Sequence, residues 1–140
     1  LISQKISKFI SKGDIFFLIG ELGVGKTTFV RFLINHLQEK FNQQITEVQS
    51  PTFNIVNEYE LNDLKIMHYD LYRINDKSEL KNIGLFENDD NSILFVEWPE
   101  IIENKPKKII ELNFNYEDNL KKRNLIIATD CKQDLIDEFK

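Results

Sequence analysis

Residues 20–27 read Gly-Glu-Leu-Gly-Val-Gly-Lys-Thr, and this octet constrains the fold more than any other feature of the chain. It matches the pattern G-x-x-x-x-G-K-[ST], a glycine-rich turn that presents backbone N–H groups to phosphate oxygens. The motif requires a buried strand before it and a helix after it. Residues 15–19 are apolar. A helical repeat follows the octet at Phe29, Val30, Leu33, Ile34 and Leu37. Both flanks are present, so a glycine-rich turn without a ligand is the weaker interpretation.

The same loop supplies groups that hold a nucleotide. The Lys26 ammonium can lie between the terminal phosphates, and the Thr27 hydroxyl can ligate Mg²⁺. Thr52, in a Ser-Pro-Thr-Phe segment, occupies the region where nucleotide switches place a threonine that senses the γ-phosphate; an ordinary turn hydroxyl is the alternative. The residues expected to bind the nucleotide are Glu21, Leu22, Gly23, Val24, Gly25, Lys26, Thr27, Thr28 and Thr52.

Length and charge narrow the function classes. A chain of 140 residues with 41% hydrophobic content fills one core, so we expect a single domain over residues 1–140. The net charge is −5, and 15 lysines and 3 arginines are scattered without a basic stripe. This composition argues against a direct grip on nucleic acid, and any nucleic acid is expected to be held by a partner.

The cysteine count and the length of the apolar runs bear on the cellular compartment of the protein. Cys131 is the only cysteine, which excludes an internal disulfide and favours the reducing cytoplasm. No apolar run approaches the roughly 20 residues that span a bilayer, and no signal peptide is visible. The chain opens at Leu1 inside a helical pattern, so we expect some N-terminal residues to be missing.

Strand and helix patterns alternate at first and strands then follow one another. Helices are predicted over residues 1–12, 26–41, 76–83 and 133–139. Strands are predicted over 15–19, 53–61, 64–70, 92–98, 108–114 and 124–129, with 53–61 and 64–70 forming an antiparallel hairpin. This order predicts an α/β fold of the P-loop NTPase type, with three layers and a mixed central sheet flanked by helices.

Two acids end predicted strands and are candidate catalytic residues together with Lys26. Glu97 closes an apolar strand, the position of a Walker B acid that holds Mg²⁺ directly or through water; a solvent-facing acid is the alternative. Asp70 ends the strand before it and is expected to orient the attacking water. A structural ion pair between Asp70 and Arg73 is the competing interpretation. The expected metal ligands are therefore Thr27 and Glu97.

Histidine, tryptophan and the base-binding segment carry less information. His68 is expected to be a hydrogen-bonded strand residue rather than a metal ligand. Trp98 is either a reporter beside the nucleotide or a core residue. GTPases specify guanine with Asn-Lys-x-Asp, whereas residues 104–107 end in lysine, so ATP is the better assignment. Residues 128–130 are considered as an adenine wall.

Four segments taken in order resemble the TsaE (YjeE) family. They are residues 20–28, 50–53, 68–73 (His-Tyr-Asp-Leu-Tyr-Arg) and 96–99 (Val-Glu-Trp-Pro). That family is the small bacterial ATPase of the machinery that makes N6-threonylcarbamoyladenosine at position 37 of tRNAs reading codons that begin with A. The resemblance covers about residues 9 to 130. Glu21 and Val24 stand where aspartate and alanine are usual, and neither side chain is required by the loop chemistry.

The resemblance implies roles and partners. Lys26 and Thr27 would bind ATP and Mg²⁺, Glu97 would be the metal acid, and Asp70 would be needed for hydrolysis. A nucleotide contact that the family draws from before the first helix has no counterpart, because the chain begins too late. The implied partners are TsaB and TsaD, with tRNA contacted only indirectly and weak ATPase activity in isolation. Two alternatives stay open, a nucleotide-gated binding module and a small-molecule kinase.

Overall fold

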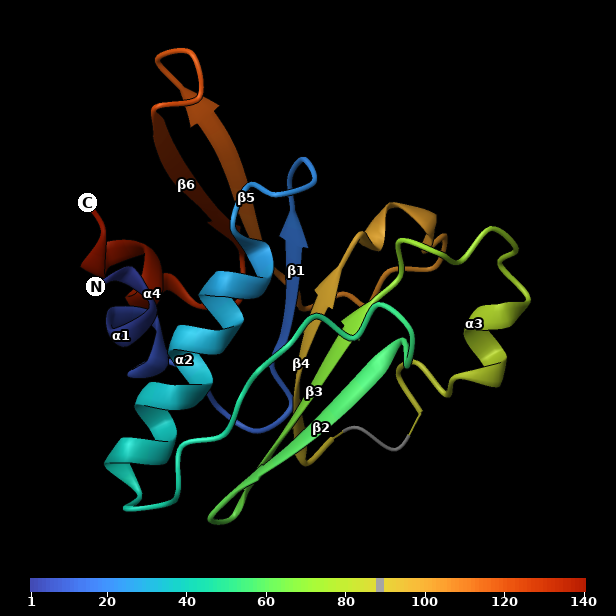
Figure 1. Cartoon of the computed structure of the whole chain (residues 1–140), viewed down its shortest axis with the longest axis horizontal. Coiled ribbons are helices and arrows are strands. Elements are labelled where there is room, and N and C mark those ends of the chain that lie inside the picture. Colours follow the sequence, from blue (N-terminus) through green and yellow to red (C-terminus); the bar gives the residue numbers. More distant parts are fainter. Residues whose placement is uncertain (88–89) are drawn as a thin grey trace.

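The computed structural model describes residues 1–87 and 90–140 as an α/β fold on one six-stranded sheet (Figure 1). The strand order is β2-β3-β4-β1-β5-β6. The bounds are β1 (Ile15–Ile19), β2 (Val56–Leu61), β3 (Leu64–Asp70), β4 (Ser92–Glu97), β5 (Ile110–Glu117) and β6 (Lys122–Thr129). Strands β3, β4, β1 and β5 run parallel, and β2 and β6 pair antiparallel at the two edges. The sheet is mixed, as the sequence predicts.

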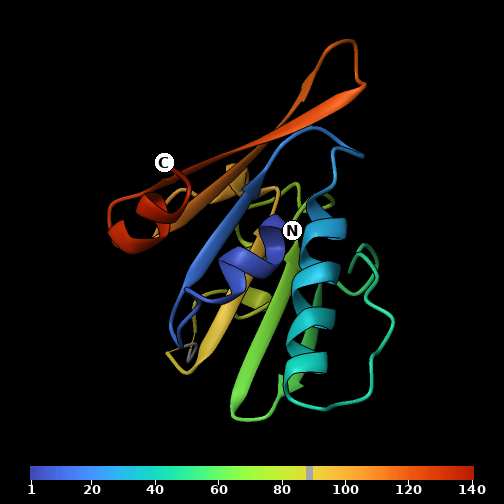
Figure 2. The ribbon, with the colours of Figure 1, turned by 90° about the vertical axis from the view of Figure 1, so that its left-hand side faces the viewer.

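Helices lie on both faces of the sheet, which confirms the predicted layers. The bounds are α1 (Ile2–Ser7), α2 (Lys26–Lys40), α3 (Glu79–Asn82), the 3₁₀ turn η1 (Pro99–Ile101) and α4 (Gln133–Glu138). Helices α1 and α2 cover the face that is turned toward the viewer in Figure 2, whereas α3 and η1 belong to the other face. None of the helices in the described ranges combines the length and apolar character needed to cross a membrane.

Strand alternation divides the core into two halves. Successive side chains point to opposite faces of a strand, so Phe16 and Phe17 enter different clusters. Phe16 stacks on Phe95 of β4 with ring centroids 4.8 Å apart, beneath α2. Phe17 packs with Tyr69 on the opposite side. Every residue of β4 is buried, because this strand is covered on both faces.

The first helix and the first hairpin strand are shorter than predicted. Helix α1 ends at Ser7, and the next N–H groups close a tight turn, with Phe9 N–H bonded to the Ile6 carbonyl at 2.9 Å. Strand β2 begins at Val56 because Ile55 adopts φ +66° and donates to the Pro51 carbonyl at 2.7 Å. Each segment carries two large apolar residues, Phe9 and Ile10 in one and Phe53 and Ile55 in the other, so periodicity alone extends the elements into these turns.

The final hairpin is longer than predicted. The polar stretch expected to separate two strands is itself paired, with Tyr116 opposite Arg123. The turn is confined to residues 118–121, where Asp118, Asn119 and Leu120 all take positive φ. Pairing between β1 and β5 stops at Asn113, so the rest of the hairpin projects as a two-stranded ribbon beyond β1 (Figure 1). Residues 115–123 are polar except for Tyr116 and Leu120, so in the sequence this part of the hairpin resembles a loop.

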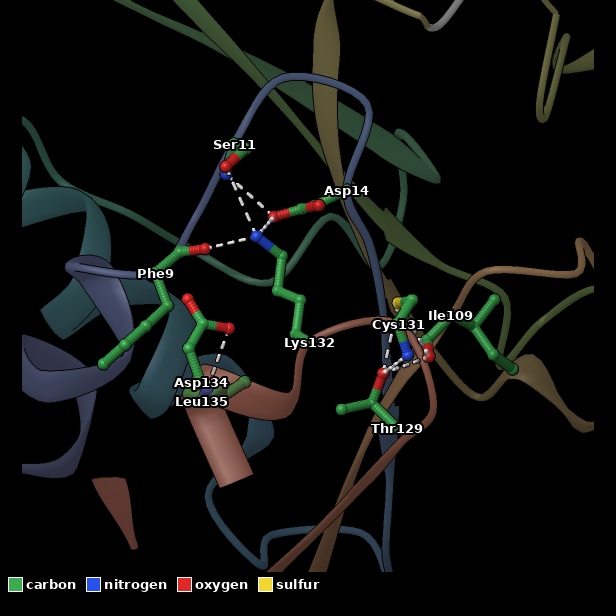
Figure 3. Close-up of polar contacts among 9 residues, drawn as sticks. All are labelled: Phe9, Ser11, Asp14, Ile109, Thr129, Cys131, Lys132, Asp134 and Leu135. Atoms are coloured by element: carbon green, nitrogen blue, oxygen red, sulfur yellow. Dashed lines mark hydrogen bonds and ion pairs between the residues drawn. The ribbon is translucent and has the colours of Figure 1, made fainter. Parts of the chain in front are cut away.

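A polar cluster closes the end of the sheet where β1 begins (Figure 3). The Lys132 ammonium lies 2.8 Å from Asp14 Oδ2, and both side chains are about seven-eighths buried, with 13% and 14% exposed. Lys132 also donates to the Phe9 carbonyl and, at 3.3 Å, to the Ser11 hydroxyl. We call these four residues the Lys132 cluster. It ties the segment before β1 to the chain that enters α4.

Candidate functional site

The carboxyl ends of β1, β3 and β4 meet beside the beginning of α2, which follows the glycine-rich loop directly. Parallel pairing places Asp70 of β3 opposite Glu97 of β4, and Glu97 opposite Leu18 of β1. A cavity of about 330 Å³ opens there. Its lining residues are Leu22, Gly23, Gly25, Lys26, Thr27, Thr28, Ser50, Thr52, Asp70, Tyr72, Glu97 and Trp98. The fold therefore gathers segments that are up to 76 residues apart in sequence.

Two of the predicted loop residues point elsewhere. Glu21 lines a separate hollow with Phe114 and Tyr116. The Val24 side chain is buried and packs against Gly20: a Cβ added to Gly20 would lie 2.8 Å from Val24 Cγ1. Glu21 and Val24 can therefore reach a ligand in the cavity only through their main-chain N–H groups.

Glycine is required at Gly20 and Gly25 for different reasons. A Cβ on Gly20 would lie 2.7 Å from the Phe114 carbonyl oxygen, so the ribbon of β5 and β6 packs directly on the loop. Gly25 has φ +116°, a left-handed conformation that side chains oppose, and α2 begins at the next residue. The loop thereby delivers the N-terminus of a 15-residue helix to the cavity, where free N–H groups favour an anion.

Thr27 and Glu97 meet at the base of the cavity. The Thr27 hydroxyl donates to Glu97, lying 2.9 Å from Oε2 and 3.1 Å from Oε1. The Glu97 residue is only 3% exposed. No group of three or more His, Cys, Asp or Glu side chains forms a metal cage within residues 1–87 and 90–140. One hydroxyl and one carboxylate fit Mg²⁺, which binds few protein oxygens and completes its octahedron with water and phosphate.

His68 is a site residue whose importance the sequence does not reveal. It is a hydrogen-bonded strand residue, as expected, but its partner is Glu97: the Nε2 to Oε2 distance is 2.6 Å, and His68 is completely buried. Its position two residues before Asp70 is the signal that points to the site, since residues i and i+2 of a strand share a face.

Asp70 is held by neutral donors. Ser50 Oγ donates to Asp70 Oδ2 at 2.9 Å, and the Tyr72 N–H donates to Oδ1 at 3.0 Å. Thr52 Oγ1 in turn donates to Ser50 Oγ at 3.1 Å. Arg73 instead lies 4.5 Å from the centroid of the Phe53 ring, and no ion pair joins it to Asp70 in the described part of the chain. The competing interpretation, an ion pair between Asp70 and Arg73, therefore has no contact to support it.

Lys26 is buried without a counter-charge. Its ammonium donates to the Gly20 carbonyl and lies 3.6 Å from the centroid of the Trp98 ring, which contacts Tyr72. Among the described residues no carboxylate oxygen is within 4.0 Å of Nζ. Burial lowers the pKa of Lys26 below the ordinary 10.5, an effect opposed by Glu97, Glu100 and Asp70.

A second cavity, of about 370 Å³, lies on the far side of Gly25. Three phenylalanines, Phe29, Phe32 and Phe114, line it together with Arg123 and Asn124. The adenine wall considered at residues 128–130 is wrong, because that segment pairs with the beginning of β5, at the other end of the sheet.

Comparison with known proteins identifies the family. The protein-family model described as "Threonylcarbamoyl adenosine biosynthesis protein TsaE" matches residues 1–125 of the 140 residues in the chain. The chain belongs to the TsaE family. Relatives called tRNA threonylcarbamoyladenosine biosynthesis protein TsaE include those of Rickettsia felis, 34% identical over 96% of this chain and 80% of the relative, and Haemophilus influenzae, 34% identical over 91% and 79%. The TsaE protein of Aquifex aeolicus is 39% identical over 78% of this chain and 74% of its own.

A solved structure agrees with this assignment. The crystal structure of Bacillus subtilis YdiB is similar to the whole fold, with a TM-score of 0.71 and 25% identity over 98% of this chain and 83% of that chain. The predicted family and the predicted α/β fold are both confirmed. As a TsaE family member, the chain takes part in threonylcarbamoyladenosine modification of tRNA and belongs to a family of P-loop ATPases.

Proposed function

We propose that this TsaE family member binds ATP with Mg²⁺ and hydrolyses it. The activity would serve threonylcarbamoylation of adenosine 37 in tRNAs that read ANN codons. The observation that carries the proposal is the contact between Thr27 and Glu97 at the base of the cavity, next to a buried Lys26 that forms no ion pair with any described residue. A lysine without a counter-charge beside a helix N-terminus is a site for a phosphate chain.

Each chain segment has a proposed role. Main-chain N–H groups of residues 21–28 would bind the phosphates, and Lys26 would exchange the Gly20 carbonyl for phosphate oxygens. Thr27 and Glu97 would hold Mg²⁺, which when bound neutralises charge on the terminal phosphates. Asp70 would orient the attacking water.

Thr52 and Ser50 supply the proposed link between the nucleotide and the surface. Thr52 bonds to Ser50, and Ser50 bonds to Asp70, so the Ser-Pro-Thr-Phe segment is connected to the acid that would orient water. Phe53, next in the chain, is 82% exposed. This arrangement supports the second candidate function, in which nucleotide occupancy governs docking to a partner. Measuring partner affinity with ATP, ADP and a non-hydrolysable analogue tests it, and equal affinities in all three states would reject it.

The proposed partners are the TsaB and TsaD proteins, which would contact tRNA in place of this chain, in the cytoplasm. The net charge of −5 supports this division of labour, because a direct grip on tRNA depends on clustered lysine and arginine. The base would occupy the cavity beyond Gly25, where phenylalanine rings offer a stacking surface.

Hydrolysis is tested by replacing the two acids without changing their shape. Glu97→Gln and Asp70→Asn should each lower the turnover number for ATP by about 100-fold, because each removes a charge that acts on the reacting phosphate or water. Both variants should still bind ADP measurably by calorimetry. Glu60→Gln is the matched control, since this acid is exposed on β2 and lies outside the cavity lining. Wild-type turnover in both acid variants, measured with and without TsaB and TsaD, would refute the assignment.

A further inference from the structure

Among the residues that the structure describes, His68 is the one fully buried polar side chain that touches the candidate metal site without belonging to the phosphate loop or to a strand end. It lies in the middle of β3, opposite Phe95 of β4, on the face that α2 covers. Glu97 is two residues further along β4 and is therefore its diagonal neighbour. Diagonal neighbours on adjacent strands are within reach of long and aromatic side chains, which explains the 2.6 Å contact.

The direction of this hydrogen bond follows from the chemistry of its partners. An ionised carboxylate only accepts, so the proton of the bond must be on Nε2. Nδ1 is buried and has no hydrogen-bond partner among the described residues. A neutral ring with its proton on Nε2 leaves only an acceptor unpaired, whereas a proton on Nδ1 would leave a buried donor unpaired. The arrangement thus favours His68 as a donor to Glu97.

The two donors to Glu97 hold different parts of the carboxylate. His68 contacts Oε2 alone, from inside the sheet. Thr27 spans both oxygens from the cavity side, at 2.9 Å and 3.1 Å, and its hydroxyl oxygen keeps lone pairs that can face an ion. Oε1 therefore carries the fewer contacts and is the oxygen available to a cation or its water.

We propose that His68 is a positioning residue that fixes the Glu97 carboxylate through Oε2, so that Oε1, the oxygen with fewer contacts, stays available to a cation. The role rests on the proposed function, because it concerns the same site. The His68 side chain has only two rotatable bonds and is completely buried on β3, so the position of its Nε2 is fixed by packing. It keeps the acid in one orientation before the metal arrives. Partners that orient a ligating group in this way typically change metal affinity by about 10- to 100-fold.

The test separates magnesium-linked binding from binding itself. Affinity for ADP is measured by calorimetry with Mg²⁺ and with EDTA, and the ratio of the two affinities is the readout. His68→Leu, which removes the donor at similar volume, should lower this ratio by about 10-fold or more while leaving the affinity in EDTA unchanged. His68→Gln, which can present an N–H near the position of Nε2, should restore most of the ratio. Met67→Leu on the opposite face of β3 is the matched control.

Several results would overturn the proposal. One is that His68→Leu keeps the wild-type ratio of ADP affinities with Mg²⁺ and with EDTA. Another is that His68→Leu loses ADP affinity equally under both conditions, which is the result expected of a purely structural residue. If His68→Leu does not fold, His68→Gln is compared with His68→Asn, whose amide is too short to reach Glu97; equal ratios then reject the role. Absence of nucleotide binding already in the wild type would refute the proposed function itself and the role with it.

Discussion

Two mostly buried lysines lie at opposite ends of β1 and differ in their surroundings, because within the described ranges Lys132 forms an ion pair and Lys26 does not. In the Lys132 cluster the ammonium lies 2.8 Å from a carboxylate and also donates to a carbonyl and a hydroxyl (Figure 3). Lys26 has a carbonyl and an aromatic ring, while the nearby acids Glu97 and Asp70 accept from neutral donors. The ion pair of Lys132 joins two segments of the chain, whereas the ammonium of Lys26, which lacks such a partner among the described residues, is available to bind an anionic ligand.

This contrast distinguishes a structural cluster from a binding site without reference to any family. Both clusters join segments that are distant in sequence, and both are mostly buried. Only the one at the carboxyl ends of the parallel strands opens into a cavity and lies at a helix N-terminus. Ligands in open α/β sheets bind at that end, which agrees with the electrostatic argument.

The largest expected effect comes from removing the unpaired lysine. Lys26→Met should weaken ADP binding by about 100-fold, because charge-assisted hydrogen bonds to phosphate are lost. Its free energy of unfolding should be equal to or higher than that of the wild type, because a desolvated charge has been removed. Calorimetry and urea unfolding measure the two quantities. A marked loss of stability would show that Lys26 is structural and would break the comparison.

The paired lysine should behave in the opposite way. Lys132→Met leaves Asp14 mostly buried without its ion pair and should cost about 1–2 kcal/mol of stability, which lowers the melting temperature by about 5 °C. ADP affinity should not change, because the cluster lies at the other end of β1. Lys122→Met, which removes an exposed pair with Asp118, is the control and should cost well under about 1 kcal/mol. Equal melting temperatures for the two variants would contradict the structural role of the Lys132 cluster.

The smallest effect is a pH dependence of stability. The pKa of Lys26 is lower in the folded protein than the ordinary 10.5 of the unfolded chain, because burial disfavours the ammonium. Between the pKa of Lys26 in the folded protein and its pKa in the unfolded chain, the unfolded state binds more protons than the folded state. The free energy of unfolding therefore rises with pH between these two pKa values, and this gain is lost as the pH falls through the folded pKa. The stability advantage of Lys26→Met should therefore shrink as pH approaches 10.5. Urea unfolding of both proteins over the alkaline range measures the difference, and a constant difference would reject the shift.

Local patterns determine much of this protein. The octet at residues 20–27, its flanking strand and helix, and the acids that end β3 and β4 are all visible in the sequence, because strand and helix periodicity and glycine spacing are short-range properties. They are enough to predict a mixed α/β sheet with a phosphate loop, and the resemblance of four segments is enough to predict the TsaE family.

Tertiary structure alone decided how these pieces act on one another. The parallel register of β3 and β4 brings His68 beneath Glu97, and the long loop before β2 brings Ser50 to Asp70. The tertiary structure also keeps Lys26 out of ion pairs with the acids of the described residues, and it pairs Lys132 with Asp14. Composition records how many charges a chain carries, but the distance between two charges and their exposure to water exist only after the sheet has formed, and these fix their energies.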